Sequence, residues 1–282
     1  MTRHQQLKLL FDNYSIQYQE HIMYMNRLYD FKIDDTYILI ALTAQYNMYF
    51  VPLSEPISKS YFKDVSNSFS TICKHLFIVW DWDDLSKIAS MFKHKKKLRA
   101  SNCVIKAITA SEAEEFINAY HLQGTCRGQT IRLGLYTKDN ELIQIMTFGK
   151  PRYNKNYEYE LLRLCTKTGY IVYGGAQKLF NYFYYKYLPQ SIISYCDCSK
   201  FTGKVYTSLG FVHRPASPSI HWVRIKPYQH ITDNLLRCKG ADNLLGTTFG
   251  KGTSNTEIML GAGFLPVPDC GQDVYTTTFE IV

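Results

Sequence analysis

The stretch from Arg163 to Phe211 constrains the fold more than any other part of the chain. Its apolar pattern predicts a strand at Glu160–Cys165, and the small residues Gly174-Gly175-Ala176 then lead into a helix at Gln177–Leu188. Two consecutive isoleucines mark a second strand at Ser191–Tyr195. A strand that enters a helix through small residues and is followed by another strand is typical of a βαβ unit. The turn leaves backbone N–H groups at the helix N-terminus, where an anionic group can bind.

The residues before this unit indicate a small α/β domain at 1–100. We expect helices at Gln5–Phe11, Ser60–Cys73 and Asp81–Phe92, an extended stretch at Tyr14–Tyr18, strands at Leu28–Phe31, Tyr37–Leu42 and His75–Trp80, and irregular chain at Asn47–Pro56.

A second domain is predicted at 101–226, followed by a C-terminal extension at 227–282 that packs on it. Ser111 is the expected N-cap of a helix to Ala119, with Glu114 closing a capping box. The remaining predicted elements are strands at Cys103–Ile108, Arg132–Tyr136, Leu142–Phe148, His221–Ile225 and Val274–Ile281, and a helix at Thr256–Leu260. The expected fold class is α/β (α+β).

The net charge of +8 and a pI near 8.9 favour a polyanionic partner such as DNA. The run from Lys93 to Arg99 is interpreted either as a solvated linker or as a phosphate-contacting strip. A polar loop at Gly149–Tyr159 adds basic residues among tyrosines, which suit stacking on bases. The candidate DNA contacts are Lys93, Lys95, Lys96, Lys97, Lys150, Arg152 and Lys155.

The 8 cysteines are scattered along the chain, and only Cys196 and Cys198 are close together, without a second pair for zinc. We therefore expect free thiols, no metal and a reducing compartment. The chain has neither a signal-peptide pattern nor an apolar run of the ~20 residues that a membrane span needs. The expected location is the cytoplasm, with no membrane partner, and the oligomeric state stays open.

The segment from Cys103 to Ile225 resembles the acetyltransferase fold of the GNAT superfamily. The likeness rests on Arg163 in its strand, the Gly174-Gly175-Ala176 turn, and the ending Val205-Tyr206-Thr207-Ser208-Leu209-Gly210-Phe211. Within the superfamily it is similar to the Mom DNA-modification protein of phage Mu and its relatives. The shared features are Ser194-Tyr195-Cys196-Asp197 with Gly203 and Tyr206, and His121 close to Gly124.

This resemblance implies group transfer from acetyl-CoA or another acyl-CoA to an adenine amino group of DNA. The cofactor would lie at Gly174, Gly175, Ala176 and Gln177, although Ile171 departs from the superfamily's usual first loop position. The implied catalytic residues are Asp197, Tyr206, Arg163 and His121. Asp197 would orient or deprotonate the amine and Tyr206 would protonate a leaving thiolate, with Arg163 holding the substrate and His121 at the rim. Each also has a structural interpretation. Asp197 would be a turn residue, Tyr206 a packed aromatic, Arg163 an ion-pair partner of Asp197, and His121 a core or solvated histidine.

A second resemblance, to phage Hef-like homing endonucleases, covers nearly the whole chain. It rests on Tyr29-Asp30-Phe31, Ile78-Val79-Trp80-Asp81-Trp82, His121-Leu122-Gln123-Gly124, Met146-Thr147-Phe148-Gly149-Lys150 and Asp269-Cys270-Gly271. It implies that residues 1–100 form a Vsr-like or PD-(D/E)XK nuclease domain, in the cytoplasm of a phage's host.

Several positions depart from that nuclease pattern. Ala41 stands where the second metal-binding carboxylate belongs, and Asn47-Met48, Phe62 and Val65 replace the supporting residues. One carboxylate such as Asp30 does not suffice for Mg²⁺, so we expect a nuclease fold without nuclease chemistry. A silent DNA-binding or inhibitor protein and an active homing endonuclease remain the alternatives to group transfer.

Overall fold

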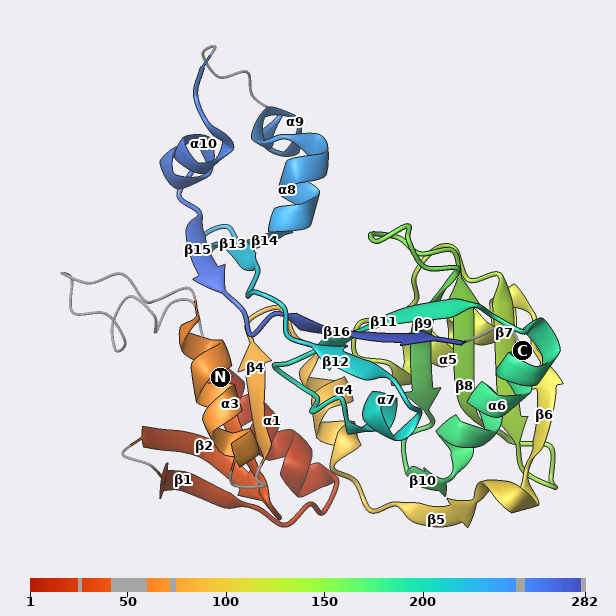
Figure 1. Cartoon of the computed structure of the whole chain (residues 1–282). Coiled ribbons are helices and arrows are strands. Elements are labelled where there is room, and N and C mark those ends of the chain that lie inside the picture. The colour runs from red at the N-terminus through yellow and green to blue at the C-terminus, as the bar shows by residue number, and fades with distance from the viewer. Residues whose placement is uncertain (25–26, 42–59, 72–74, 247–251, 280–282) are drawn as a thin grey trace.

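The computed structural model describes residues 1–24, 27–41, 60–71, 75–246 and 252–279. The expectations for 42, 47–56, 72–73 and 280–281 lie outside these residues. The described chain forms sheets of four, two, seven and three strands (Figure 1). No helix in this part of the chain combines the length and apolar character needed to cross a bilayer. Every cysteine in it is a free thiol.

The N-terminal sheet has the order β1-β2-β3-β4, with β3 and β4 parallel and the other pairs antiparallel. Its strands are β1 (Gln19–Tyr24), β2 (Arg27–Ile33), β3 (Thr36–Ala41) and β4 (His75–Trp80), and its helices are α1 (Arg3–Asn13), α3 (Tyr61–Thr71) and α4 (Leu85–Met91). Strand β1 is not predicted by the sequence, where only Tyr14–Tyr18 reads as extended. Its residues do not alternate between apolar and polar, because β1 is an edge strand with little buried surface.

Both faces of this sheet are covered because β3 is apolar at successive positions. Tyr37 and Leu39 pack toward α3, whereas Ile38 and Ile40 pack toward α1 and α4. Helix α1 buries Leu7 and Phe11 in the second of these cores. The small α/β architecture expected for this part of the chain is present.

The largest sheet has the order β12-β16-β11-β9-β8-β7-β6. Its strands are β6 (Val104–Ala107), β7 (Ile131–Tyr136), β8 (Leu142–Gly149), β9 (Tyr159–Thr166), β11 (Ser191–Asp197), β12 (Val212–Arg214) and β16 (Gln272–Thr278). All neighbours are antiparallel except β9 and β11. The last strand of the chain, β16, lies inside the sheet between β11 and β12, so the C-terminal extension completes it.

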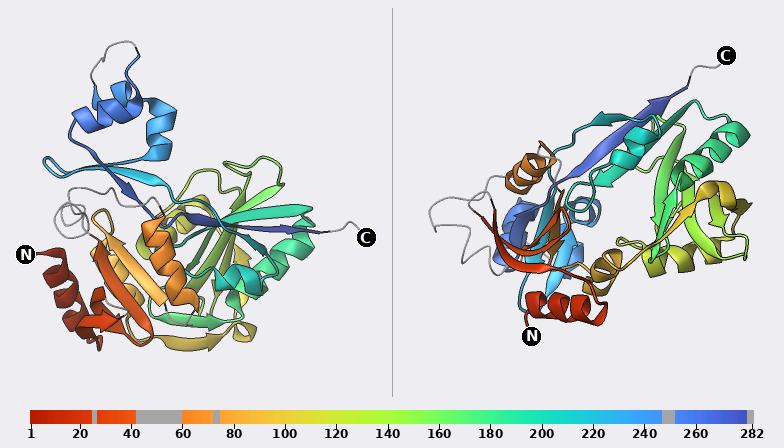
Figure 2. Two further views of the ribbon diagram at one scale, coloured as in Figure 1. Left: turned by 60° about the vertical axis from the view of Figure 1, so that its left-hand side comes forward. Right: turned by 90° about the horizontal axis from the view of Figure 1, so that it is seen from below.

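Helices α5 (Ala110–Tyr120) and α6 (Gly175–Tyr187) cover opposite faces of this sheet (Figure 2). Alternation along β8 explains this, because Ile145 packs with α5 whereas Met146 and Phe148 pack with α6. The predicted cap of α5 is displaced. Thr109 is the N-cap and Glu112 closes the capping box, because β6 ends early enough for the helix to begin before Ser111.

The lysine run is not a bare linker, because part of it forms a strand. Lys96–Arg99 form β5, which pairs in parallel with β10 (Tyr170–Tyr173). Leu98 packs against the core below, while Lys96 and Lys97 stay exposed. The short 3₁₀ helix η1 (Ala100–Asn102) then leads into β6.

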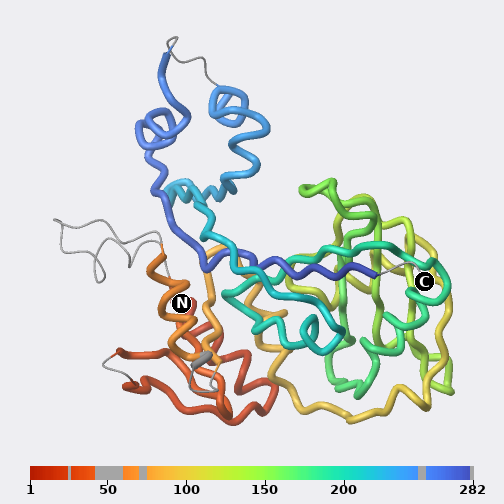
Figure 3. The backbone as a smooth tube through the Cα atoms, in the orientation of Figure 1, coloured from red at the N-terminus to blue at the C-terminus, as the bar shows by residue number. Residues whose placement is uncertain are grey.

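The three-stranded sheet has the order β14-β13-β15 and carries three helices on an extension that projects away from the rest (Figure 3). Its elements are β13 (Ile220–Arg224), β14 (Gln229–Thr232), α8 (Asp233–Lys239), α9 (Ala241–Leu245), α10 (Asn255–Gly261) and β15 (Leu265–Pro268). The expected strand at His221–Ile225 and helix at Thr256–Leu260 correspond to β13 and α10.

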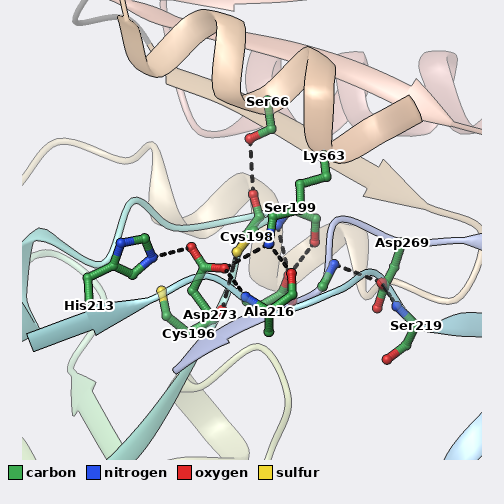
Figure 4. A network of polar contacts seen from close by, with 12 residues as sticks. Lys63, Ser66, Cys196, Cys198, Ser199, His213, Ala216, Ser219, Asp269 and Asp273 are labelled. Atoms are coloured by element: carbon green, nitrogen blue, oxygen red, sulfur yellow. Dashed lines mark hydrogen bonds and ion pairs between the residues drawn. The ribbon is translucent and has the colours of Figure 1, made fainter. Parts of the chain in front are cut away.

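The N-terminal sheet is joined to the loop that follows β11. The backbone N–H of Ile78, on β4, donates to the Ser199 carbonyl at 2.8 Å. The buried Lys200 ammonium lies 2.5 Å from the Asp83 carboxylate. In α3, Lys63 pairs with Asp273 at 2.8 Å and Ser66 Oγ donates to the Cys198 carbonyl at 3.3 Å (Figure 4). Residues 1–100 thus support the loop at 197–200 directly.

Candidate active site

The two parallel strands at the centre of the large sheet separate early. Strands β9 and β11 are joined only at Tyr159–Ile192 and Glu160–Ile193, although both continue to Thr166 and Asp197. A register shift between β8 and β9 places an extra residue, Leu162, just after this point. The separation leaves the carboxyl ends of the two strands without a shared ladder, which is where ligands bind in open α/β sheets.

Arg163 and Tyr206 both lie beside this separation. Arg163 Nε donates to the Gly124 carbonyl and Nη1 to the Leu162 carbonyl, both at 2.9 Å. Tyr206, on α7 (Lys204–Ser208), stacks on Tyr275 at 4.9 Å between ring centroids. Burial raises the pKa of Tyr206 to about 12 against the opposing effects of a Ser194 hydrogen bond and the Arg163 charge. Tyr206 therefore keeps its proton near neutral pH, and Arg163 is close enough to act on it.

His121 and Asp197 are linked through Gln123. His121 ends α5, and its Nδ1 accepts from the Gln123 backbone N–H at 3.1 Å. The Gln123 side-chain amide donates to Asp197 Oδ2 at 3.5 Å. Burial, aided by the Arg163 charge, lowers the pKa of His121 to about 3, so the imidazole is neutral. Asp197 Oδ1 accepts from both the backbone N–H and hydroxyl of Ser199, at 2.9 and 2.5 Å.

The four predicted catalytic residues thus occupy one neighbourhood, but through different links. The Arg163 charge acts on both Tyr206 and His121, whereas Asp197 is reached through Gln123. Among the described residues, Arg163 forms no ion pair, so the predicted pair with Asp197 is not formed. The sequence assigns no role to Gln123 itself, although Gln123 belongs to the His121-Leu122-Gln123-Gly124 stretch of the endonuclease resemblance.

The N-terminus of α6 is built by glycines. Gly174 is the N-cap, with a φ of 73°, and no side chain caps the helix. A Cβ on Gly175 would overlap Gln144 Oε1 and lie 2.8 Å from Val172 Cγ1, so only glycine fits. Ala176 and the exposed Gln177 complete the first turn. The first N–H groups of such a helix have no acceptor within it.

A cavity of about 770 Å³ lies at this helix end. It is lined by Arg99, Ala100, Ser101, Tyr173, Gly174, Gln177, Lys178 and Asn181. Lys178 donates to the carbonyls of Ala100 and Cys103, at 2.9 and 2.6 Å, and so fixes η1 against α6. The exposed Arg99 supplies positive charge at the cavity. Arg99 was not among the predicted cofactor residues, because its place beside α6 depends on the β5–β10 pair.

Arg152 has an internal partner and is not a free DNA contact. Its guanidinium donates to Glu160 Oε1 through Nε at 2.8 Å and Nη2 at 2.6 Å, and its backbone N–H donates to Oε2 at 2.7 Å. Glu160 is fully buried at the start of the β9–β11 separation and requires a counter-charge. A sequence pattern gives no sign that this glutamate, eight residues away, faces inward.

The other predicted DNA contacts fall into two groups. Lys93 lies over the Tyr14 ring at 3.4 Å, and Lys155 donates to the Pro151 carbonyl. Burial lowers the pKa of Lys95. Lys96, Lys97 and Lys150 are exposed, and Lys155 is exposed as well in spite of its contact with Pro151.

At the position of the expected nuclease site, Asp30 is engaged in local contacts. Its Oδ2 accepts from the Ile40 backbone N–H at 2.7 Å, and its Oδ1 lies 2.9 Å from His4 Nδ1. Ala41 is buried at the end of β3, and Phe62 is buried against Trp80. Asp30 therefore has a structural role, in which it joins β2 to β3 and to α1.

No family model matches this chain, and no curated protein matches it. Three solved structures are similar to it. A putative acetyltransferase from Acinetobacter baylyi ADP1 has 12% identity and a TM-score of 0.37, over 63% of this chain and 93% of that one. Spermidine/spermine N-acetyltransferase SpeG from Vibrio cholerae, in complex with manganese ions, has 11% identity and a TM-score of 0.35, over 64% and 94%.

A putative streptothricin acetyltransferase from Bacillus anthracis str. Ames, in complex with acetyl coenzyme A, has 10% identity and a TM-score of 0.35. It matches over 63% of this chain and 99% of its own. These weak likenesses identify no activity. The strand order itself makes this chain an α/β protein with a mixed seven-stranded sheet, in agreement with the fold class that the sequence predicted.

Proposed function

We propose that residues 101–282 form a GNAT-like group transferase that takes an acyl group from acetyl-CoA or another acyl-CoA and delivers it to a base amino group of DNA. The observation that carries the proposal is the early separation of β9 and β11, with Arg163 and Tyr206 beside it and the uncapped N-terminus of α6 following β9 in the chain. The choice of the adenine amino group follows from the Mom resemblance.

The residues around α6 fit the diphosphate end of an acyl-CoA. The first helical N–H groups and the helix dipole favour an anion there. Gly174 and Gly175 let the backbone approach closely, since Gly174 has a positive φ that side chains rarely adopt and a Cβ on Gly175 would overlap Gln144 Oε1. Arg99 adds a cation at the adjoining cavity. These features support acyl-CoA binding in spite of Ile171.

Bound acyl-CoA would supply an activated acyl group and a thiolate leaving group. Tyr206 Oη holds its proton at neutral pH and is therefore suited to donate it to a departing anion. Asp197 Oδ2, held by Gln123, is suited to orient an incoming amine. Neutral His121 fixes the Gln123 backbone and so positions the Gln123 amide.

The acceptor assignment rests on charge. The net charge is +8, and Lys96, Lys97 and Lys150 are exposed. Such lysines contact phosphates without reading sequence. A duplex adenine would have to leave the base stack to reach Asp197, so single-stranded or mismatched DNA is expected to react faster.

The test is to incubate the full chain with DNA and acetyl-CoA, digest the DNA and measure the nucleoside masses. Deoxyadenosine is expected to gain one acetyl group. Tyr206→Phe should lower the rate by about 10²–10³-fold, the usual cost of losing one transition-state hydrogen bond. Asp197→Asn keeps the oxygen that Ser199 contacts and should lower the rate similarly. Tyr185→Phe, at an exposed tyrosine outside the proposed site, is the matched control.

Two results would refute the transferase. DNA whose gel mobility is retarded but whose nucleosides are unchanged would identify a binding protein. Cleavage that requires Mg²⁺ and is abolished by Asp30→Ala would identify a nuclease.

A further inference from the structure

The N-terminal sheet carries a group of polar side chains that the proposed transfer does not use. We name it the His4 cluster, and its members are His4 and Lys8 on α1, Glu20 and His21 on β1, and Asp30 on β2. One ligand atom from each of His4, Glu20 and His21 lies within 4.8 Å of the other two. Two separate elements, α1 and β1, therefore bring metal-ligating groups together.

The imidazole of His4 is held on both faces and at both edges. It stacks on Phe31 at 4.4 Å and on His21 at 4.9 Å, and the Phe31 ring is fully buried. Its Nδ1 lies 2.9 Å from Asp30 Oδ1 and its Nε2 lies 3.1 Å from Glu20 Oε1. The direction of each ring nitrogen is thus fixed by the fold.

A neutral imidazole cannot satisfy both carboxylates, because it has only one N–H. When Nδ1–H donates to Asp30, the lone pair of Nε2 faces Glu20 Oε1, and two acceptors meet at 3.1 Å. A metal ion between them would accept the lone pair of Nε2 and bind Glu20 Oε1. A carboxylate on the far ring nitrogen is also the usual way in which a metal-binding histidine is oriented.

The backbone at His21 is strained in a way that adds a third ligand. Neighbouring residues of a strand normally point to opposite faces. His21 has a φ of 51°, in the left-handed region that non-glycine residues seldom occupy. Its ring consequently stacks on His4, which itself contacts Glu20, so consecutive residues reach the same site.

We propose that His4 Nε2, Glu20 Oε1 and a ring nitrogen of His21 bind a divalent transition-metal ion of the zinc class, with water at an open fourth position. Two imidazoles and one carboxylate suit zinc, whereas Mg²⁺ and Ca²⁺ prefer oxygen ligands. Asp30 orients His4 and is not a ligand. The site therefore differs from the two-carboxylate nuclease site, and it departs from the sequence-based expectation of no metal.

The distances agree with this assignment. Ligand bonds of about 2.0–2.2 Å in a tetrahedral site place neighbouring ligand atoms about 3.4 Å apart. The His4–Glu20 separation of 3.1 Å is already close to this value. His21 is exposed, so its ring can turn inward without disturbing the core. Lys8 contacts Glu20 Oε2 at 2.6 Å and leaves Oε1 for the metal.

The experiment titrates the full chain, freed of metal by a chelator, with Zn²⁺ alone and with Co²⁺ alone as a spectroscopic probe. We expect a site of one ion per chain that His21→Ala and Glu20→Gln each weaken at least ~10-fold. Alanine at position 21 still carries a Cβ in the left-handed region, so circular dichroism is used to show that His21→Ala stays folded. His94→Ala, at another exposed histidine, should bind as the unaltered chain does. Tyr206→Phe should also bind normally, which separates this test from that of the transferase.

Two outcomes would overturn the proposal. Equal zinc binding by His21→Ala and the unaltered chain would place the ion elsewhere, for example on the cysteines. Absence of zinc binding would leave the His4 cluster as a set of hydrogen bonds and ion pairs within the fold.

Discussion

Replacing Arg152 with alanine should destabilise the protein as a whole, and should not simply weaken its contact with DNA. Glu160 is fully buried, while the Arg152 side chain is 35% exposed. The substitution removes the two guanidinium donors at 2.6 and 2.8 Å and leaves only the backbone N–H on this carboxylate. A buried charge without its partner is far more costly than the loss of a surface ion pair.

The expected cost is about 3 kcal/mol, at the lower end of the 3–5 kcal/mol typical of breaking a buried pair. The lower end applies because the backbone donor remains and the guanidinium is partly solvated. The double variant Arg152→Ala/Glu160→Gln should recover part of this loss, because a neutral amide needs no counter-charge. The interaction between the two substitutions is what a double-mutant cycle measures.

Urea unfolding followed by circular dichroism provides the assay. With a urea dependence near 3 kcal/mol per molar, the midpoint should fall by about 1 M. Lys150→Ala, at an exposed basic residue in the same loop, is the control and should cost no more than about 0.5 kcal/mol. If Arg152→Ala is as stable as Lys150→Ala, or if Glu160→Gln does not rescue it, the argument from a buried carboxylate fails.

Three further predictions concern the rest of the molecule. Burial lowers the pKa of His121 to about 3 and the pKa of His230 to about 4, from 6.5. Acid therefore protonates these histidines in the unfolded chain before it does so in the folded one, and the free energy of unfolding should fall as the pH drops from about 6.5 toward 4. A urea midpoint unchanged between pH 7 and pH 5 would contradict this. Gly175→Ala adds a Cβ that would overlap Gln144 Oε1 at the start of α6, so the affinity for acetyl-CoA measured by calorimetry should weaken at least ~10-fold. An affinity equal to that of the unaltered chain would mean that α6 is not part of the cofactor site. If Lys96 and Lys97 contact phosphates, their double alanine variant should reduce the log–log salt slope of DNA binding by about 2, and an unchanged slope would assign them no contact.

The sequence predicted local structure better than long-range pairing. The unit from β9 to β11 was found because Gly174 and the two isoleucines mark its boundaries locally. The pairing of Lys96–Arg99 with β10 was missed, because a lysine run shows no alternation and its partner lies more than seventy residues away. The position of β16 inside the sheet was missed for the same reason.

The site residues divide in the same way. Tyr206 and Arg163 each lie in a short, recognisable sequence motif, so the topology of those motifs could predict that the two residues lie near each other. The partnership of Arg152 with Glu160 depends on which way a loop folds back over a strand, and charge alone suggested an outward role. The sequence predicted a capping box for α5 but placed it two residues too late, because both Thr109 and Ser111 are followed by a glutamate three residues later.

The attachment of β4 and α3 to the loop at 197–200 has a consequence for how such a chain can change over generations. The Lys200 side chain is only 3% exposed, and its ammonium contacts the Asp83 carboxylate and the Ile78 carbonyl. Losing residues 1–100 would strip those partners from a buried ammonium next to Asp197. A substitution at Ala41, at the end of β3, leaves this support intact, because Ala41 takes no part in these contacts. Selection acting on residues 101–282 alone would therefore also retain residues 1–100.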